Sequence, residues 1–371
     1  MKDLTNNTNS VIIFFSRPYV YAAFFSLFLS AVFVFALFDA FVIPRSLQPV
    51  PQYDASLLTS VMELPIPTDS VARDVVQMAD NEEITQILTV AANGVEGETR
   101  RESDIAEYPE DKTKAAPVDM NENKDKTPII PVITAASYKD RNIEISIETV
   151  RAYDTDVYVA DVKVGNVAYI RTAFAGNTFG RNISEKTSVI ADRHNAILAI
   201  NGDYYGFRGY GWVLRNGSLY RSGRSDTGLL MDLKGDLSCD KNRASIEKKL
   251  SNLWQIWSFG PPLVVDGAVF VSKNQEISGR SSISNPRTAI GQAGNLHYIL
   301  IVSDGRTKAS DGLSLYELAT LFKERGCSVA YNLDGGGSAT MCFNGRLINK
   351  PTTGGNRIIE REISDIVYIG Y

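Results

Sequence analysis

The sequence predicts an α+β domain, a mixed α/β sheet with hairpins and two main helices, preceded by a transmembrane helix and a disordered stalk. Three observations support this prediction. Residues 19–43 are almost uniformly apolar, residues 44–136 are rich in proline and acidic residues, and residues 137–371 hold 26 of the 28 glycines and all three tryptophans. Strand-like alternation and helical periodicity both occur in the last segment, which favours α+β.

Residues 1–18 are expected to be a short cytoplasmic tail and residues 19–43 a transmembrane signal anchor. The span is 25 residues long with one charged side chain, Asp39, and crossing a hydrocarbon core takes about 20 apolar residues. A cleaved signal peptide is the alternative, but its apolar core is only about 7–15 residues long and ends at small residues. A weak bias of basic residues before the span favours the tail inside. Everything after Pro44 is then expected outside the cytoplasm.

Residues 44–136 are expected to form an acidic, proline-rich stalk. They contain nine of the 14 prolines, eight basic and 17 acidic residues, and no Phe or Trp. Such a segment cannot bury enough apolar surface to offset the entropy of ordering it. Residues 70–92 carry apolar side chains at roughly helical spacing, which indicates a weak helix or a partner contact rather than a domain.

Residues 137–371 are expected to form one folded domain, because 235 residues can bury a full core. Their 28 basic and 24 acidic residues suit an anionic ligand, but this small excess and the lack of a basic run with interleaved aromatics argue against nucleic acid. Three widely spaced cysteines provide neither a disulfide framework nor zinc spacing. Cys327 and Cys342 flank a glycine-rich segment, and buried free thiols are favoured over a pair. The sequence does not indicate an oligomeric state.

Strands are predicted where apolar residues alternate or form short runs. They are expected at residues 143–148, 157–164, 197–200, 297–303 and 329–333. Hairpin turns are predicted at Arg215-Asn-Gly-Ser, Val265-Asp-Gly-Ala and Phe343-Asn-Gly-Arg, since Asn-Gly and Asp-Gly suit tight turns with positive φ.

Two helices are predicted, at residues 185–195 and 315–325. The second has the stronger signals, because Ser314 and Glu317 form a capping-box pair and Gly326 follows as a stop. That helix leads directly into the predicted strand at 329–333.

The most informative segment is Tyr331-Asn-Leu-Asp-Gly-Gly-Gly-Ser-Ala-Thr-Met341. It places Asp334 at a strand end, directly before Gly335, Gly336, Gly337 and Ser338. Consecutive glycines allow positive φ and present N–H groups, which together favour an anion-binding nest. A plain glycine-rich turn is the alternative.

Two other carboxylates occupy similar junctions, where ligands often bind. Asp203 lies in Asn201-Gly-Asp-Tyr-Tyr, and Asp304 lies in Ser303-Asp-Gly-Arg. Arg287 and Arg306 have the planar fork that suits phosphate. Each Asp alone is more simply explained by a turn that it stabilises with its own side chain, but three of them with two arginines indicate a site.

Five motifs in this order resemble the phosphodiester glycosidase family, over about Asn182 to Tyr371. They are Ala199-Ile-Asn-Gly-Asp-Tyr-Tyr, Phe259-Gly-Pro-Pro-Leu-Val-Val-Asp-Gly, Asn285-Pro-Arg-Thr-Ala-Ile-Gly, Asp304-Gly-Arg and Asn332-Leu-Asp-Gly-Gly-Gly-Ser. Family members of known activity hydrolyse N-acetylglucosamine from a phosphodiester and release a phosphomonoester. The resemblance implies a hydrolase for a sugar C1–O–P linkage, with a cell-surface glycan or exopolysaccharide as the expected substrate.

In such a reaction one carboxylate acts at C1 and cations or N–H groups stabilise the leaving phosphate. We expect Asp334 or Asp304 to be the base or nucleophile. Asn201 and Asp203 are expected to fix the sugar or a metal, and Arg287, Arg306 and the glycine amides to bind phosphate.

No cofactor or metal is expected. The two histidines, His194 and His297, leave little for zinc, while oxygen ligation of Ca²⁺ or Mg²⁺ at Asp203, Asp304 or Asp334 stays open. The sequence also leaves open a non-catalytic module that binds wall polymers and a metal-dependent phosphodiesterase that cuts the P–O bond.

Overall fold

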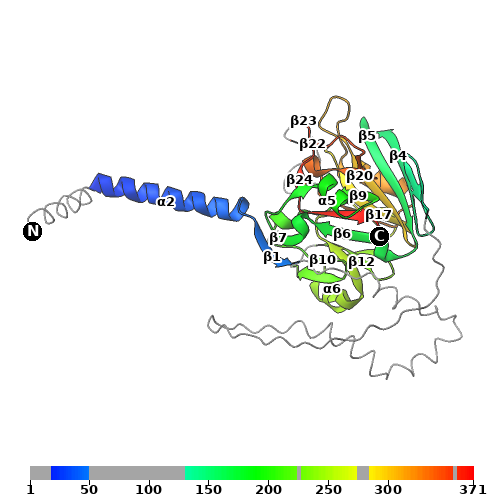
Figure 1. Cartoon of the computed structure of the whole chain (residues 1–371), viewed down its shortest axis with the longest axis horizontal. Helices are drawn as coiled ribbons and strands as arrows, with labels where there is room; N and C mark the ends of the chain where they lie inside the picture. The colour runs from blue at the N-terminus through cyan, green and yellow to red at the C-terminus, as the bar shows by residue number, and fades with distance from the viewer. Residues whose placement is uncertain (1–17, 50–129, 224–226, 274–283, 354–356) are drawn as a thin grey trace, which may run out of the picture. The chain divides into compact units, whose positions relative to one another are not determined.

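The computed structural model describes residues 18–49, 130–223, 227–273, 284–353 and 357–371 (Figure 1). Two compact units divide the chain. One contains Met1–Tyr53 and Val132–Tyr371, and the other is Asp54–Pro131. Most of the expected stalk, including the helix predicted at 70–92, lies outside the described residues, as do residues 1–17 of the expected tail.

The apolar N-terminal segment forms helix α2 (Pro18–Phe41). Within the described residues it is the one helix long and apolar enough to cross a membrane, over Tyr19–Asp39. Length and hydropathy of this kind are compatible with a signal anchor and also with a signal sequence.

Most of the domain is antiparallel β-sheet. The largest sheet has nine strands in the order β16-β15-β19-β17-β18-β5-β4-β3-β2. Their bounds are β16 Ala268–Val269, β15 Pro262–Val265, β19 Val329–Asn332, β17 Thr288–Gly294, β18 His297–Ser303, β5 Thr155–Val164, β4 Ile143–Ala152, β3 Ser137–Lys139 and β2 Val132–Ile133. Strand β19, which leads to the glycine loop, is flanked on both sides and is therefore held firmly.

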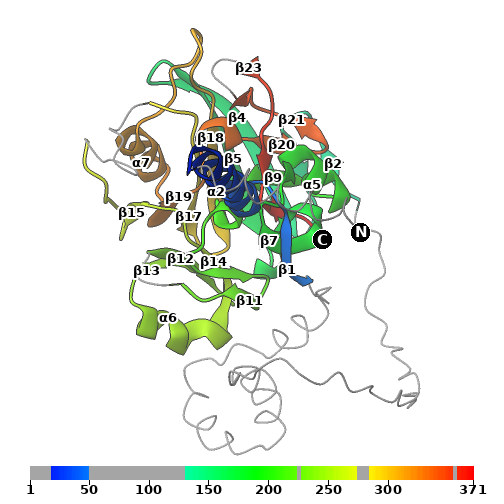
Figure 2. The ribbon, with the colours of Figure 1, turned by 90° about the vertical axis from the view of Figure 1, so that its left-hand side faces the viewer.

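The domain also contains two five-stranded sheets, in the orders β11-β10-β14-β12-β13 and β21-β20-β9-β25-β6. The first has β11 Ser218–Arg221, β10 Val213–Arg215, β14 Leu253–Trp257, β12 Gly228–Asp232 and β13 Leu237–Asp240. The second has β21 Arg346–Leu347, β20 Met341–Phe343, β9 Leu198–Asn201, β25 Asp365–Ile369 and β6 Ile170–Phe174. Helix α6 (Arg243–Lys249) packs on the first of them through Ile246 (Figure 2).

Three further strand pairs are short. They are β1 (Arg45–Pro49) with β7 (Thr178–Arg181), β22 (Thr352–Thr353) with β23 (Arg357–Ile358), and β24 (Glu362–Ile363) with β8 (Glu185–Lys186). Strands β1 and β2 both fall within residues 44–136. The start of that segment therefore pairs with the domain, and Asn182 Nδ2 also donates to the Ile43 carbonyl at 3.2 Å.

The prediction of a mixed α/β sheet was wrong in one respect. Every strand pair among the described residues is antiparallel, and the domain is mostly β. Helix-then-strand order suggested parallel crossovers, but β19 follows its helix to lie antiparallel between β15 and β17. The helices of the domain are few and short among the described residues.

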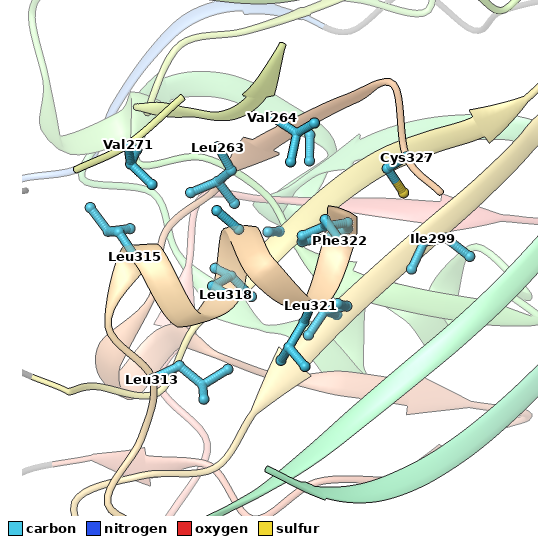
Figure 3. Close-up of a cluster of buried hydrophobic side chains, with 14 of the residues drawn as sticks. Leu263, Val264, Val271, Ile299, Leu313, Leu315, Leu318, Leu321, Phe322 and Cys327 are labelled. Carbon is cyan, nitrogen blue, oxygen red and sulfur yellow. The ribbon is translucent and has the colours of Figure 1, made fainter. Parts of the chain in front are cut away.

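Helix α7 (Leu315–Glu324) confirms the stronger helix prediction, and its capping box of Ser314 and Glu317 is formed. Its apolar face contributes Leu315, Leu318 and Phe322 to a fully buried cluster over the nine-stranded sheet (Figure 3). Fully burying such side chains stabilises by about 1.5–3 kcal/mol each. The other predicted helix is shorter than expected: α5 covers Thr187–Arg193, because Glu185 and Lys186 form strand β8.

The three predicted hairpins are confirmed. They join β10 to β11, β15 to β16 and β20 to β21. Asn216, Asp266 and Asn344 have φ of 50°, 51° and 45°, and each is followed by a glycine with positive φ, as these tight turns require. All three cysteines are free, with Cys327 and Cys342 buried.

Candidate active site

The glycine loop lies between two other segments that follow strands. The Asp334 amide donates to the Gly202 carbonyl at 3.2 Å, and the Gly336 amide donates to the Pro286 carbonyl at 2.7 Å. The three motifs that contain Asn201, Arg287 and Asp334 therefore meet, although they are far apart in the sequence. The second bond occupies the N–H of Gly336, one of the amides that the sequence analysis expected to bind phosphate.

The missing side chains of the loop glycines make room for two arginines. A Cβ on Gly336 would lie 2.9 Å from a guanidinium nitrogen of Arg306, and a Cβ on Gly337 would lie 2.7 Å from one of Arg361. Gly336 also has a φ of +63°, a conformation that costs other residues energy. The loop thus allows cationic groups, rather than only its own amides, to approach the backbone.

Asp334 is the carboxylate of this cluster. Burial raises its pKa to about 6, and Ser338, Arg361 and Arg208 oppose that shift. A carboxylate with its pKa near neutrality, beside two guanidinium groups, is typical of a group that exchanges protons or reacts.

Asn201 is the last residue of strand β9 and lies next to the glycine loop. Its Nδ2 donates to the Asp334 carbonyl at 2.6 Å, while its Oδ1 accepts from the Thr288 hydroxyl at 2.7 Å and from the Thr340 amide at 3.1 Å. These bonds tie β9, β17 and the glycine loop together. Asn201 is therefore placed to position the backbone of Asp334.

Asp203 is fully buried in an ion network. Its carboxylate accepts from Arg215 at 2.9 Å and from the backbone amides of Tyr205 and Ser258, both at 3.0 Å. Arg215 also donates to Asp365 at 2.9 Å. Breaking a buried pair leaves an uncompensated charge, so Asp203 is placed to hold the segment after β9.

Asp304 is also buried, with both oxygens in hydrogen bonds. One accepts from the Lys350 amide at 2.8 Å and the other from the Tyr158 hydroxyl at 3.1 Å. Burial raises its pKa, and those two bonds oppose the shift. The three predicted carboxylates thus have separate surroundings, and the described residues include no group of three or more His, Cys, Asp or Glu side chains that could hold a metal ion.

Arg287 and Arg306 lie near each other. Arg287 is buried and its Nε donates to the Leu313 carbonyl at 2.8 Å. Burial and then the charge of Arg306 lower its pKa to about 10. Two guanidinium groups that disfavour each other's charge would both be stabilised by a bound anion.

Sequence reasoning missed Arg208 and Arg361. Neither lies in a motif used for the prediction, and an isolated arginine gives no signal of its own. Arg208 follows Asn201-Gly-Asp by a few residues, so its proximity was the one available hint. Arg361 reaches Gly337 through tertiary structure alone.

The fold and this site define a class: an antiparallel β domain that gathers arginines around a carboxylate and a glycine loop. Residues 194–370 match the family model described as phosphodiester glycosidase. This part of the chain is therefore similar to the phosphodiester glycosidase family.

Curated relatives support the match over limited lengths. The SPbeta prophage-derived uncharacterized protein YomE of Bacillus subtilis is 30% identical over 208 residues, which cover 52% of this chain and 31% of that protein. The N-acetylglucosamine-1-phosphodiester alpha-N-acetylglucosaminidase of Mus musculus is 33% identical over 101 residues, 24% of this chain and 19% of that protein. The chain spans less than a third of either relative.

One solved structure supports the fold. The catalytic domain of the zebrafish N-acetylglucosamine-1-phosphodiester alpha-N-acetylglucosaminidase superposes with a TM-score of 0.50 at 22% identity, covering 62% of this chain and 83% of that one.

Proposed function

We propose that the C-terminal domain hydrolyses a sugar-1-phosphodiester between the sugar C1 and the phosphate oxygen, with Asp334 as the reacting carboxylate. The observation that supports this most is the convergence of Asp334, Arg361 and Arg306 on one glycine loop. A glycosidic bond to phosphate needs a carboxylate at C1 and cations at the leaving group, and this loop has both.

In the proposed reaction, the oxygen of water bonds to C1 and the C1–O bond to phosphate breaks. The electron pair of that bond stays on the departing phosphate monoester, and the proton of water passes to the Asp334 carboxylate and then to solvent. The oxocarbenium-like transition state is stabilised by the nearby negative charge. Alternatively, an Asp334 oxygen bonds to C1 first and water releases the sugar in a second step.

These two routes differ in stereochemistry. Direct attack by water inverts the anomeric configuration, whereas a covalent intermediate retains it. Proton NMR of the first sugar product, read before mutarotation, distinguishes them.

The phosphate is proposed to lie among the arginines of the loop. Arg306 lies next to Gly336 and Arg361 lies next to Gly337. Arg287 is close enough to Arg306 for the charge of Arg306 to lower its pKa. A guanidinium group can donate two parallel hydrogen bonds to the oxygens of one phosphate, and its charge stabilises the phosphate monoester dianion as it leaves. A phosphate monoester leaves more readily than a sugar alkoxide, so a strong general acid is not required.

Asp334→Asn tests the proposal, because the amide keeps the shape and removes the charge. Turnover of N-acetylglucosamine-1-phosphate methyl ester is expected to fall by at least about 100-fold, the size of a general base or nucleophile contribution. Near wild-type turnover by a folded Asp334→Asn would remove this carboxylate from the chemistry and favour Asp304.

Hydrolysis in ¹⁸O-labelled water tests which bond breaks. Label is expected in the sugar, because water attacks C1. Label in the phosphate would instead identify a phosphodiesterase that cuts the P–O bond. Absence of any turnover, with binding retained, would indicate a non-catalytic module.

We further propose that α2 is a single-pass signal anchor and that the domain lies outside the cytoplasm, where it acts on a cell-surface glycan or exopolysaccharide. The length and hydropathy of Tyr19–Asp39 support anchoring. Protease added to intact cells should release the domain. Complete protection of the domain in cells whose membranes are intact would reverse the orientation.

A further inference from the structure

The C-terminal end of helix α2 is fastened to the domain with little intervening chain. Strand β1 begins at Arg45, four residues after the helix ends at Phe41, and an extended chain of that length spans at most about 14 Å. Arg45 also forms an ion pair with Asp39, the last residue of the segment that is apolar enough to cross a membrane. The first strand of the domain therefore starts next to that segment.

Residues 50–129 do not separate the helix from the domain. They lie between β1, which pairs with β7, and β2, which pairs with β3. Both views place β1 beside β7 (Figures 1 and 2). The chain thus joins the domain before residue 50, and the distance between α2 and the domain does not depend on the segment that follows.

The loop of residues 204–210 is joined to the same end of the helix. Asn182, the residue after β7, makes the connection, because its Nδ2 donates to the Ile43 carbonyl at 3.2 Å and its backbone amide donates to the Gly206 carbonyl at 3.1 Å. A Cβ on Gly206 would also lie 3.6 Å from the carbonyl oxygen of Gly180 in β7. The start of β1, the end of β7 and this loop therefore lie side by side.

Together these segments expose apolar and aromatic side chains beside an arginine. Leu47 in β1 and Tyr210 in the loop are each 54% exposed, and Ile43 and Tyr204 are exposed as well. The Arg208 guanidinium carbon lies 5.8 Å from the centre of the Tyr204 ring and 5.6 Å from that of Tyr210. These five residues are here called the Tyr210 face. Tyrosine, arginine and apolar side chains in combination are typical of surfaces at the headgroup level of a bilayer.

The loop of the Tyr210 face is held in place by Arg221. The guanidinium of Arg221 donates to the carbonyls of Gly211 at 2.9 Å, Tyr205 at 3.1 Å, Arg208 at 2.8 Å and Tyr210 at 2.7 Å. Four bonds from one side chain fix the loop within the protein itself. Such preorganisation lowers the entropy lost on binding.

We infer that the Tyr210 face docks on the headgroup region of the bilayer that α2 crosses. The inference rests on the proposed role of α2 as an anchor, and it extends that membrane contact from the helix onto the domain. Exposed apolar patches with polar groups around them mark interaction sites, and here the short connection to α2 brings a bilayer within reach. Tyrosine rings are favoured at the headgroup level, and the Arg208 guanidinium is suited to donate to lipid phosphates.

Docking of this face has a consequence for the candidate active site. Burial, and then the charge of Asp334, raise the pKa of Tyr204, so Asp334 lies near the Tyr210 face. The domain would then work with its candidate site held close to the lipid surface, and not at the end of a long stalk.

Quenching of added tryptophans by lipid tests the inference with the full chain reconstituted in phospholipid vesicles. Lipids brominated on the acyl chain near the headgroup quench tryptophan on contact, and the three native tryptophans are buried and supply a constant background. The added fluorescence of Tyr210→Trp is expected to be mostly lost in brominated vesicles. The matched control is Phe270→Trp, since Phe270 is 63% exposed and follows β16 at the edge of the nine-stranded sheet. The control should keep its fluorescence.

Leu47→Trp separates this inference from the proposed anchor. Residue 47 lies two positions after Arg45, so it should be quenched wherever α2 crosses the bilayer, whether or not the loop docks. Quenching at residue 47 without quenching at residue 210 would overturn docking and leave the anchor in place. Absence of quenching at both positions would overturn the anchor together with the docking.

Two further results would assign the Tyr210 face differently. Equal quenching at residues 270 and 210 would show that the domain contacts lipid without a preferred face, which would overturn the inference. A tryptophan at position 210 that neither brominated lipid nor aqueous iodide quenches would be covered by protein, either a second copy or another part of the chain. That result would also overturn docking on lipid.

Discussion

Asp334 combines partial burial with a charge that the proposed reaction requires. Burial raises its pKa to about 6, so the ionised form dominates only above that pH. We expect kcat/KM for a sugar-1-phosphodiester to rise as pH increases through about 6 and then to level off. Activity that instead falls over this range would mean that Asp334 acts in its protonated form. The pH profile of kcat/KM, measured in overlapping buffers at constant ionic strength, reports the pKa of Asp334 in the free enzyme.

The same residue is expected to lower the stability of the fold. The ordinary pKa is 3.8, so ionisation costs the folded state more than the unfolded chain between about pH 4 and pH 6, and the cost is constant above that window. Asp334→Asn should therefore melt higher than the wild type at pH 7, with a difference that vanishes near pH 4. A lower melting temperature at pH 7 would show that the carboxylate stabilises the domain through its arginines.

At the scale of elements, the glycine loop depends on close approach of side chains to its backbone. Gly337→Ala would place a methyl group 2.7 Å from an Arg361 nitrogen, and the flexible arginine is expected to move away. We predict a rise in KM of about tenfold, one lost charge-assisted contact, with little loss of stability. A Tm unchanged within a few degrees together with an unchanged KM would exclude Arg361 from substrate binding.

A change in the capping box of α7 is expected to lower stability without changing KM. Ser314→Ala removes the bond that its hydroxyl accepts from the Glu317 amide at 3.2 Å, which should cost about 1 kcal/mol of stability. Because α7 packs in the core rather than at the loop, KM should stay unchanged. Denaturant melts of Ser314→Ala and Gly337→Ala side by side therefore separate stability from binding.

At the scale of the whole molecule, the segment after α2 is part of the domain's surface. Strand β1 pairs with β7 over Arg45–Pro49 and covers an edge that would otherwise expose unpaired backbone groups. A chain of residues 42–371 should melt roughly 2–4 °C above one of residues 130–371, for about 1 kcal/mol at this size. Equal melting temperatures would mean that β1 does not pair with β7 in solution.

Local signals in the sequence were sufficient for the elements that depend on neighbours in the chain. The turn at Asn216, the capping box at Ser314 and the apolar span of α2 each follow from a few adjacent residues. The relative direction of paired strands depends on residues that are far apart in the sequence. Local signals could not show it, so a mixed sheet was predicted where all pairing among the described residues is antiparallel. The role of Asn201 was also beyond local reasoning, since its partners Thr288 and Thr340 are far along the chain.

The sequence by itself determined that an apolar helix precedes a strand-rich domain and that a carboxylate stands before three glycines at a strand end. Periodicity, turn residues and motif order carry that information because they act over a few residues. Only the tertiary structure decided that Arg208 and Arg361 join Arg306 at this loop, while Asp203 and Asp304 are bound elsewhere. Charge interactions act through space over a few ångströms, and the distance between two residues along a chain does not report that separation.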